Sequence, residues 1–279
     1  MVEIRELVAV DQAIFAKVDI ARGTRISAEI PLIMLPPTTP FEEELSGVCK
    51  IVDSLTNEEL KELDQLPCSS KMADEIRERG FVANQVWSFY KSKKLKNSDG
   101  TLLKGKKLRK IVNKMVNLCI SYLLNNVQLG PSGKYGSGLF SLYSRIGHSC
   151  VPNAFSYWNP TLQRLTIHAI HDIKAGQQIF VNYTGTTCWT RNQRGFSLYA
   201  VWKIVCNCEA CTDDAIDKLR YRMLLLDQAL AAYQLGISHD PRRTGVPKLE
   251  TAQQALCAAE ELVKLLKRQR LCGMEICRA

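Results

Sequence analysis

The pattern of apolar and polar positions changes character three times along the chain. Residues 2–35 read as short strands, with an apolar run at 13–16, a turn at 19–24 and a second apolar run at 31–34. Pro36 and Pro37 end this region, because proline cannot donate a hydrogen bond to a strand ladder. We therefore expect β-strands up to residue 37.

A helical pattern replaces the strand pattern between residues 38 and 126. Thr56 is followed by Asn57 and by two acids, which is typical of a helix start. Apolar residues then recur at spacings of three and four, as on one face of a helix; they are Ile111, Met115, Leu118, Cys119 and Tyr122.

Strand character returns between residues 139 and 183. Two β-rich runs, at 165–170 and 178–183, are separated by a turn at Gly176. From residue 213 onward the pattern predicts two amphipathic helices, broken at residues 240–245. We expect these two helices to pack against the rest of the chain without chemistry of their own.

The composition is that of a globular protein. The chain has 279 residues, of which 46% are hydrophobic and 23% are charged. It contains no apolar run of about 18 residues, so a membrane span is not expected. Glu3, Arg5 and Glu6 interrupt the apolar start, which argues against a secretory signal. We expect an intracellular protein, of the nucleus or the cytoplasm or both, with no membrane partner.

Positive charge is concentrated in one stretch. The formal net charge is +9, and residues 91–110 carry nine Lys or Arg against the single acid Asp99. This stretch is either a solvated loop or a surface for nucleic acid or nuclear import, because clustered positive charge attracts phosphates. No aromatic residue follows Lys91 within it, so base stacking has little support.

The densest chemical signal is a cluster of cysteines. Cys206, Cys208 and Cys211 fall within six residues, and three thiolates so close can hold one zinc ion at about 2.3 Å. A structural site needs a fourth ligand from elsewhere in the chain. The plain alternative is three incidental cysteines in a turn; a redox role lacks a thioredoxin-like context.

Four ordered segments resemble the motifs of SET domains. Residues 147–153 resemble the family's Asn-His-Ser-Cys-x-Pro-Asn motif, and the late cysteines resemble the post-SET zinc knuckle. Residues 175–183 resemble the Gly-Glu-Glu-x-x-x-x-Tyr segment, and residues 14–26 resemble the opening strands. The chain is thus similar to SET-domain protein-lysine methyltransferases, as a MYND-less relative of the SET/MYND-type and fungal SET proteins.

The resemblance implies an α+β fold: small curved β-sheets, a helical insertion, a post-SET zinc knuckle and a C-terminal helical hairpin. The expected segments are the N-terminal part of the SET domain (1–37), the insertion (38–135), the C-terminal part of the SET domain (136–186), the zinc-binding segment (187–213) and the helical region (214–279).

The resemblance also implies a function, an S-adenosylmethionine-dependent protein-lysine N-methyltransferase with a structural zinc ion. Its partner is a protein with a target lysine, and histones are among the candidates. Tyr183 takes the catalytic position, and Tyr183 with Ile204 the lysine channel. The zinc ligands are Cys150, Cys206, Cys208 and Cys211, and the cofactor-binding residues are Ala13, Ile14, Asn125, Gly147 and His148.

Three departures fall on cofactor or substrate positions. Residues 8–13 hold no glycine where the family has Pro-Gly-x-Gly-x-Gly, and Asp11 adds a carboxylate there. Gly147 replaces the motif asparagine, and residues 202–205 replace an aromatic-Gly-Phe run, so that the smaller Ile204 stands in the channel. Two alternatives to an active enzyme therefore stay open: a catalytically inactive SET module that binds protein, and a basic nucleic-acid-associated protein.

Overall fold

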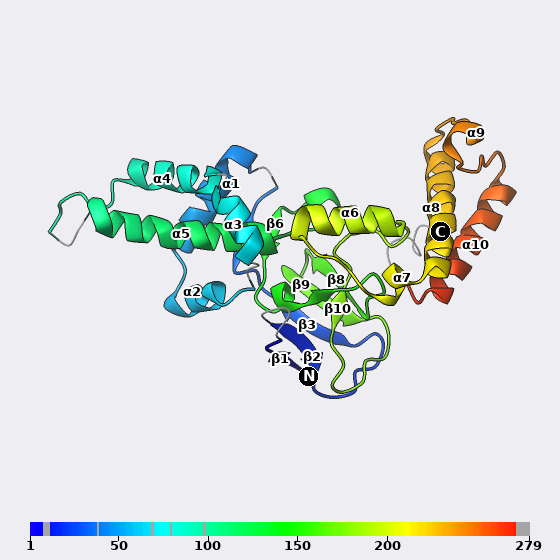
Figure 1. Cartoon of the computed structure of the whole chain (residues 1–279), viewed down its shortest axis with the longest axis horizontal. Coiled ribbons are helices and arrows are strands. Elements are labelled where there is room, and N and C mark those ends of the chain that lie inside the picture. Colours follow the sequence, from blue (N-terminus) through cyan, green and yellow to red (C-terminus); the bar gives the residue numbers. More distant parts are fainter. Residues whose placement is uncertain (8–11, 38, 68–69, 79, 97–98, 272–279) are drawn as a thin grey trace. The chain divides into compact units, whose positions relative to one another are not determined.

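The computed structural model describes the chain except residues 8–11, 38, 68–69, 79, 97–98 and 272–279 (Figure 1). Its contacts divide the chain into two compact units. The first consists of Met1–Val18, Arg25–Ile146 and Ser156–Ile167, and the second of Asp19–Thr24, Gly147–Phe155 and His168–Ala279. Each unit is thus assembled from segments that are distant in sequence.

Short strands form several small sheets. Strands β1 (Val2–Arg5) and β2 (Ala13–Ala16) pair antiparallel, with Ile4 opposite Ile14. A three-stranded antiparallel sheet has the order β4 (Ile33–Leu35), β6 (Ser137–Leu139), β5 (Val127–Gln128). Another has the order β3 (Arg25–Glu29), β9 (Arg164–Ala169), β8 (Ala154–Asn159). The strands predicted near both ends of the SET-like region are therefore present.

The helical region of the first unit comprises α1 (Phe41–Val52), α2 (Asn57–Asp64), α3 (Ser70–Glu78), α4 (Phe81–Lys93) and α5 (Gly105–Asn125). The predicted start of α2 is confirmed: Thr56 and Glu59 form a capping box, in which each side chain accepts a hydrogen bond from the other residue's backbone. Two short 3₁₀ helices, Pro131–Gly133 and Tyr143–Arg145, follow later in this unit.

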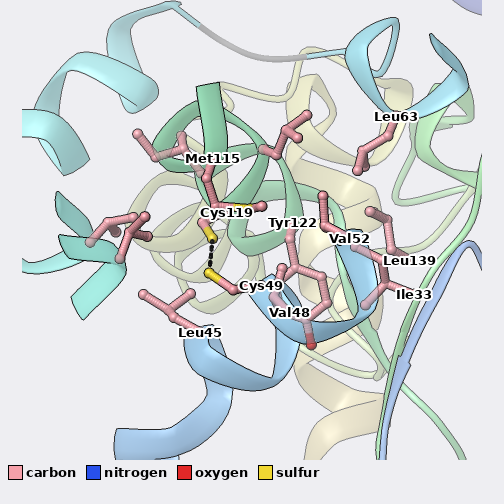
Figure 2. Close-up of a cluster of buried hydrophobic side chains, with 14 of the residues drawn as sticks. Ile33, Leu45, Val48, Cys49, Val52, Leu63, Met115, Cys119, Tyr122 and Leu139 are labelled. Atoms are coloured by element: carbon pink, nitrogen blue, oxygen red, sulfur yellow. Dashed lines mark hydrogen bonds between the residues drawn. The ribbon is translucent and has the colours of Figure 1, made fainter. Parts of the chain in front are cut away.

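Helices α1, α4 and α5 enclose the apolar core of the first unit (Figure 2). The predicted buried face of α5 is correct at Met115, Leu118, Cys119 and Tyr122, but Ile111 is 39% exposed. The fully buried Val112 takes its place, because positions 112, 115, 119 and 122 keep the three-and-four spacing that a helix needs to present one stripe.

The second unit contains the parallel pair β7 (Gly147–His148) and β10 (Phe180–Val181) and the helices α6 (Arg191–Trp202) and α7 (Glu209–Thr212). Helices α8 (Asp214–Leu235) and α10 (Ala252–Arg268) pack against each other, with the short α9 (Pro241–Thr244) between them in sequence. The predicted C-terminal hairpin is therefore present, and with it the α+β fold class is confirmed. None of the helices in the described part of the chain is long and apolar enough to cross a membrane.

Candidate metal centre and the adjacent tyrosine

Two segments of the second unit bring four cysteines together. Cys150 follows β7, whereas Cys206 and Cys208 lie between α6 and α7, and Cys211 lies within α7. All four sulfur atoms lie within 4.8 Å of one another. The sulfur of Cys150 is 3.5 Å from that of Cys211 and 4.0 Å from that of Cys206. The structure thus brings Cys150, the residue predicted as the fourth ligand, next to the three late cysteines.

The cluster has the dimensions of a tetrahedral metal site. Four sulfurs at zinc–sulfur distances of about 2.3 Å would lie about 3.8 Å from each other. The sulfur–sulfur separations of 3.5 Å (Cys150 to Cys211) and 4.0 Å (Cys150 to Cys206) bracket that value. A set of four thiolates with no open position suits a structural zinc ion and holds no place for a reacting water.

The charges of the thiols also favour a cation at this place. Hydrogen bonds with Cys150 and then Cys206 lower the pKa of Cys211 to about 6 and lower that of Cys208 further. Hydrogen bonds with Cys206 and the other thiols raise the pKa of Cys150. Some of the thiols ionise only at the expense of others, because like charges repel. A divalent cation removes this conflict, since it compensates the thiolates together.

Two arginines that the sequence did not single out are buried beside the cluster. Arg194 of α6 and Arg220 of α8 are both completely inaccessible to solvent. Arg194 donates hydrogen bonds to the carbonyl oxygens of Trp189 and Ala210. Arg220 donates to the carbonyl oxygen of Cys150 at 2.9 Å and to that of Thr187. Helix α8 therefore contributes a buried hydrogen-bonding side chain in addition to its apolar packing.

No sequence signal pointed to these two arginines. Arginine in a helix is usually exposed or only its stem is buried. The apolar periodicity of α8 marks the core positions and is silent on a buried cation. The two arginines stand out only in the structure, where they lie next to the cysteines.

Tyr183 lies close to the cysteine cluster. It follows β10, and its backbone N–H donates a hydrogen bond to Nδ1 of His148 at 3.0 Å. The ring of Tyr183 is 5.3 Å from that of His148 and 5.2 Å from that of Trp202, between centroids. Trp202 and Ile204 pack with Tyr183 around Cys150 in one apolar cluster. The two residues predicted to line a lysine channel, Tyr183 and Ile204, are thus brought together.

His148 connects the tyrosine to the cysteines. Burial lowers the pKa of its imidazole to about 4, so the ring is neutral at pH 7. Because Nδ1 accepts from the Tyr183 amide, the single ring hydrogen belongs on Nε2. Nε2 lies 3.3 Å from the sulfur of Cys150. One imidazole therefore donates toward a metal ligand and accepts from the backbone of the candidate catalytic residue.

Comparison with known proteins decides the family. The family model of the SET domain matches residues 12–184, well over half of the chain. The chain belongs to the SET domain family. The family predicted from the motifs is confirmed.

Named relatives point the same way. The chain is 29% identical to histone-lysine N-methyltransferase set5 of Schizosaccharomyces pombe over 142 residues, which is 48% of this chain and 44% of that protein. It is 36% identical to protein-lysine N-trimethyltransferase SMYD5 of Homo sapiens over 84 residues, 29% of this chain and 20% of that one. The chain thus spans less than half the length of these curated relatives.

One solved structure aligns with the chain at low similarity. The SET domain of LSMT bound to lysine and AdoHcy aligns over 96% of this chain and 69% of its own, with a TM-score of 0.42 and 11% identity. That similarity is too low to add to the SET assignment.

The five residues expected to bind the cofactor in a SET domain fall in both units. Ala13 and Ile14 are buried on β2 and Asn125 ends α5, all in the first unit. Gly147 and His148 form β7 in the second. The preceding positions of the glycine motif, including Ala9 and Asp11, lie outside the described residues.

The polar side chains at these positions are already engaged. The Asn125 amide nitrogen donates to the carbonyl oxygens of Pro67 and Ser121, both at 2.9 Å. The two ring nitrogens of His148 face Tyr183 and Cys150. A cofactor would therefore be left with backbone groups and acceptors rather than side-chain donors at these five positions.

Gly147 stands where the SET motif has asparagine, and its surroundings leave little room for a side chain. A Cβ atom there would lie 3.1 Å from the amide nitrogen of Gln178 and 3.3 Å from the ring of Phe180. The side chains of Gln178 and Phe180 thus fill the space beside residue 147.

Lys203 occupies the place of the glycine in the SET family's aromatic-Gly-Phe run. It ends α6 in the left-handed conformation, with φ of 54°. That conformation costs a residue with a Cβ about 1–2 kcal/mol relative to glycine.

Proposed function

We propose that this protein is an S-adenosylmethionine-dependent protein-lysine N-methyltransferase with a structural zinc centre. The observation that carries the proposal is the position of Tyr183, packed against Trp202 and Ile204 beside the four-cysteine cluster. The names of the relatives, histone-lysine and protein-lysine methyltransferases, support it. We propose a protein with a target lysine as the partner, with histones as the first candidates, and an intracellular site of action.

The residues around Tyr183 suit the handling of a lysine side chain. Lysine has an ordinary pKa near 10.4, so its reactive neutral form is scarce at pH 7. Apolar surroundings such as Trp202 and Ile204 disfavour the ammonium form and lower that pKa. The Tyr183 ring then confines the amine and aligns it, and alignment alone contributes several kcal/mol in favourable cases.

S-adenosylmethionine, when bound, supplies the methyl group on a positively charged sulfur. We propose Ala13, Ile14, Asn125, Gly147 and His148 as the residues that bind it, because they stand at the positions that match the family's cofactor motifs. His148 contributes through its backbone, since both ring nitrogens already face Tyr183 and Cys150.

The zinc ion has a structural role in this proposal. Cys150 belongs to the segment that follows β7, and the other three ligands belong to the segment after Trp202 and Ile204. A metal that joins them fixes the substrate-channel residues next to Tyr183. Structural zinc contributes folding free energy directly, because the site does not exist in the unfolded chain.

The test is cofactor binding followed by methyl transfer. Calorimetry with S-adenosylmethionine on zinc-loaded protein should show binding, and radiolabelled methyl should pass to histones or to another protein. Tyr183→Phe should abolish transfer. Tyr157→Phe, a change at an exposed tyrosine, is the matched control and should leave it intact. Absence of heat at millimolar cofactor would end the proposal.

A catalytically silent SET module that binds protein is the second candidate. It is favoured by the engaged side chains of Asn125 and His148 and by the filled space at Gly147. It predicts a folded, zinc-containing protein with no affinity for S-adenosylmethionine. Methyl transfer that Tyr183→Phe removes would exclude it.

The basic stretch supports nucleic-acid association as a third candidate. It covers the end of α4, the connection closed by the Lys96–Leu102 bridge, and the start of α5. No acidic residue lies in the first turn of α5, where a helix favours negative charge. Binding to DNA or RNA should weaken steeply as salt rises. Absent or salt-insensitive binding would dispose of it.

A further inference from the structure

The two buried arginines of the second unit lack an ordinary counterion. Arg194 and Arg220 are fully inaccessible, and their hydrogen bonds within the described part of the chain go to carbonyl oxygens and a sulfur rather than to a carboxylate. A buried charge without compensation costs several kcal/mol. Negative charge must therefore be near, and the thiolates are the groups that can supply it.

The geometry places the arginines against the thiolates. Nη2 of Arg194 lies 3.7 Å from the sulfur of Cys211. A guanidinium keeps its charge at pH 7, so both arginines are buried cations beside the cysteine cluster.

The charges balance when a divalent metal is included. Four thiolates around one zinc ion carry a net charge of minus two. The two arginines carry plus two. The buried assembly of ion, ligands and arginines therefore has no net charge. The metal centre alone and the arginine pair alone are both charged.

The same arginines also tie down the segments that hold the ligands. Arg220 joins the carbonyl of Cys150 to that of Thr187, and Arg194 joins the carbonyl of Ala210, next to Cys211, to that of Trp189. Each arginine thus links one ligand segment to residues 187–189.

We infer that Arg194 and Arg220 are positioning residues of the zinc centre, which neutralise its net charge and fix its two ligand segments. The inference rests on the proposed zinc centre, and it states what determines the affinity of that centre for a divalent metal. Outer residues of this kind change metal affinity by about 10–100-fold in known sites.

The test compares charge-removing with charge-keeping substitutions in the full chain. Zinc affinity is measured by competition with a chromophoric chelator for Arg194→Met, Arg220→Met, Arg194→Lys and Arg220→Lys. The methionine variants should bind zinc about 10–100-fold more weakly than the unmodified protein. The lysine variants should recover a large part of that loss, because they restore the charge without the planar fork.

Arg222→Met is the matched control. Arg222 lies on the same helix two residues after Arg220, but it is partly exposed and pairs with Glu261 at 2.6 Å. Its loss should leave zinc affinity unchanged. Far-UV circular dichroism shows whether each variant folds; where a methionine variant does not, the Arg→Gln variant at that position replaces it.

Cobalt(II) adds a readout that a purely structural role would not move. The sulfur-to-cobalt charge-transfer band should shift to lower energy in Arg194→Met, because loss of the positive charge raises the energy of the Cys211 sulfur electrons. Arg222→Met should leave the band in place. Equal metal affinity in the methionine variants and the unmodified protein, or lysine variants as weak as methionine ones, would overturn the inference. If the unmodified protein gave no four-sulfur cobalt spectrum, the zinc proposal itself would fail.

Discussion

In the part of the chain that the structure describes, two groups of cysteines have sulfur atoms close together, but the surroundings of the two groups differ. Cys49 and Cys119 lie 3.9 Å apart between sulfurs in the core of the first unit (Figure 2), surrounded by aliphatic side chains. The four cysteines of the second unit lie next to two buried arginines and a histidine. The difference shows that short sulfur–sulfur distances do not by themselves make a metal site.

The number of ligands and the surrounding charge separate the two groups. The hydrogen bond with Cys49, and then burial, raise the pKa of Cys119, so the Cys119 thiol stays protonated. Buried free cysteines of this kind behave as small apolar side chains. In the second group the pKa of Cys208 and Cys211 is lowered, and cations lie within reach of the sulfurs. The first unit is thus held by packing, and we expect the second to depend on a metal.

Removal of zinc should have the largest effect. Zinc binding to structural sites is worth on the order of 10 kcal/mol, so a strong chelator should lower the melting temperature of the second unit by well over 10 °C. Cys208→Ser should give the same result without chelator. Differential scanning calorimetry measures both. A melting curve that chelator leaves unchanged would contradict the expectation that the second unit depends on a metal.

A core truncation in the first unit should come next. Leu118 of α5 is 3% exposed within the core, and Leu118→Ala should destabilise the protein by about 2–5 kcal/mol through the cavity that it leaves. Zinc content, measured by elemental analysis, should not change. A loss of zinc in this variant would show that the two units are not held independently.

Cys49→Ala is the sharper test of the core cysteines. It removes one buried sulfur, and we expect a loss of about 1 kcal/mol with unaltered zinc stoichiometry. Urea denaturation measures the change in the free energy of unfolding. Reduced metal content here would assign the pair a role that its surroundings do not support.

The smallest effect should be a gain. Lys203 has a φ of 54°, and Lys203→Gly should stabilise the protein by about 0.5–1 kcal/mol, since relief of the left-handed strain exceeds the entropy that glycine loses. Lys93→Gly, at the last residue of α4, should instead destabilise it. Thermal melts of the zinc-loaded variants distinguish the two signs.

The family and the cysteine cluster could be predicted from sequence because they depend on short patterns. The spacing of Cys206, Cys208 and Cys211 predicts a shared ligand site, and the motif around Cys150 indicates the fourth sulfur. The start of α2 at Thr56 was likewise predictable, since a capping box is local.

What could not be predicted depends on contacts between distant residues. Arg194 and Arg220 are of interest because they contact Cys211 and Cys150. No periodicity in the sequence indicates that a charged helix residue is buried. The Gln178 amide beside Gly147 is a contact across β7 and β10. Ile111 was misplaced by one position, because Ile111 and Val112 are equally apolar and only the packing of α5 chooses between them.

The imidazole of His148 has a practical consequence for genetics. One ring serves two neighbours, the amide of Tyr183 and the sulfur of Cys150. A substitution at residue 148 therefore removes two contacts at once. An inactive variant would not reveal which lost contact caused the loss of activity. Tyr183→Phe and Cys208→Ser, which each touch one side, are the alleles that separate the two.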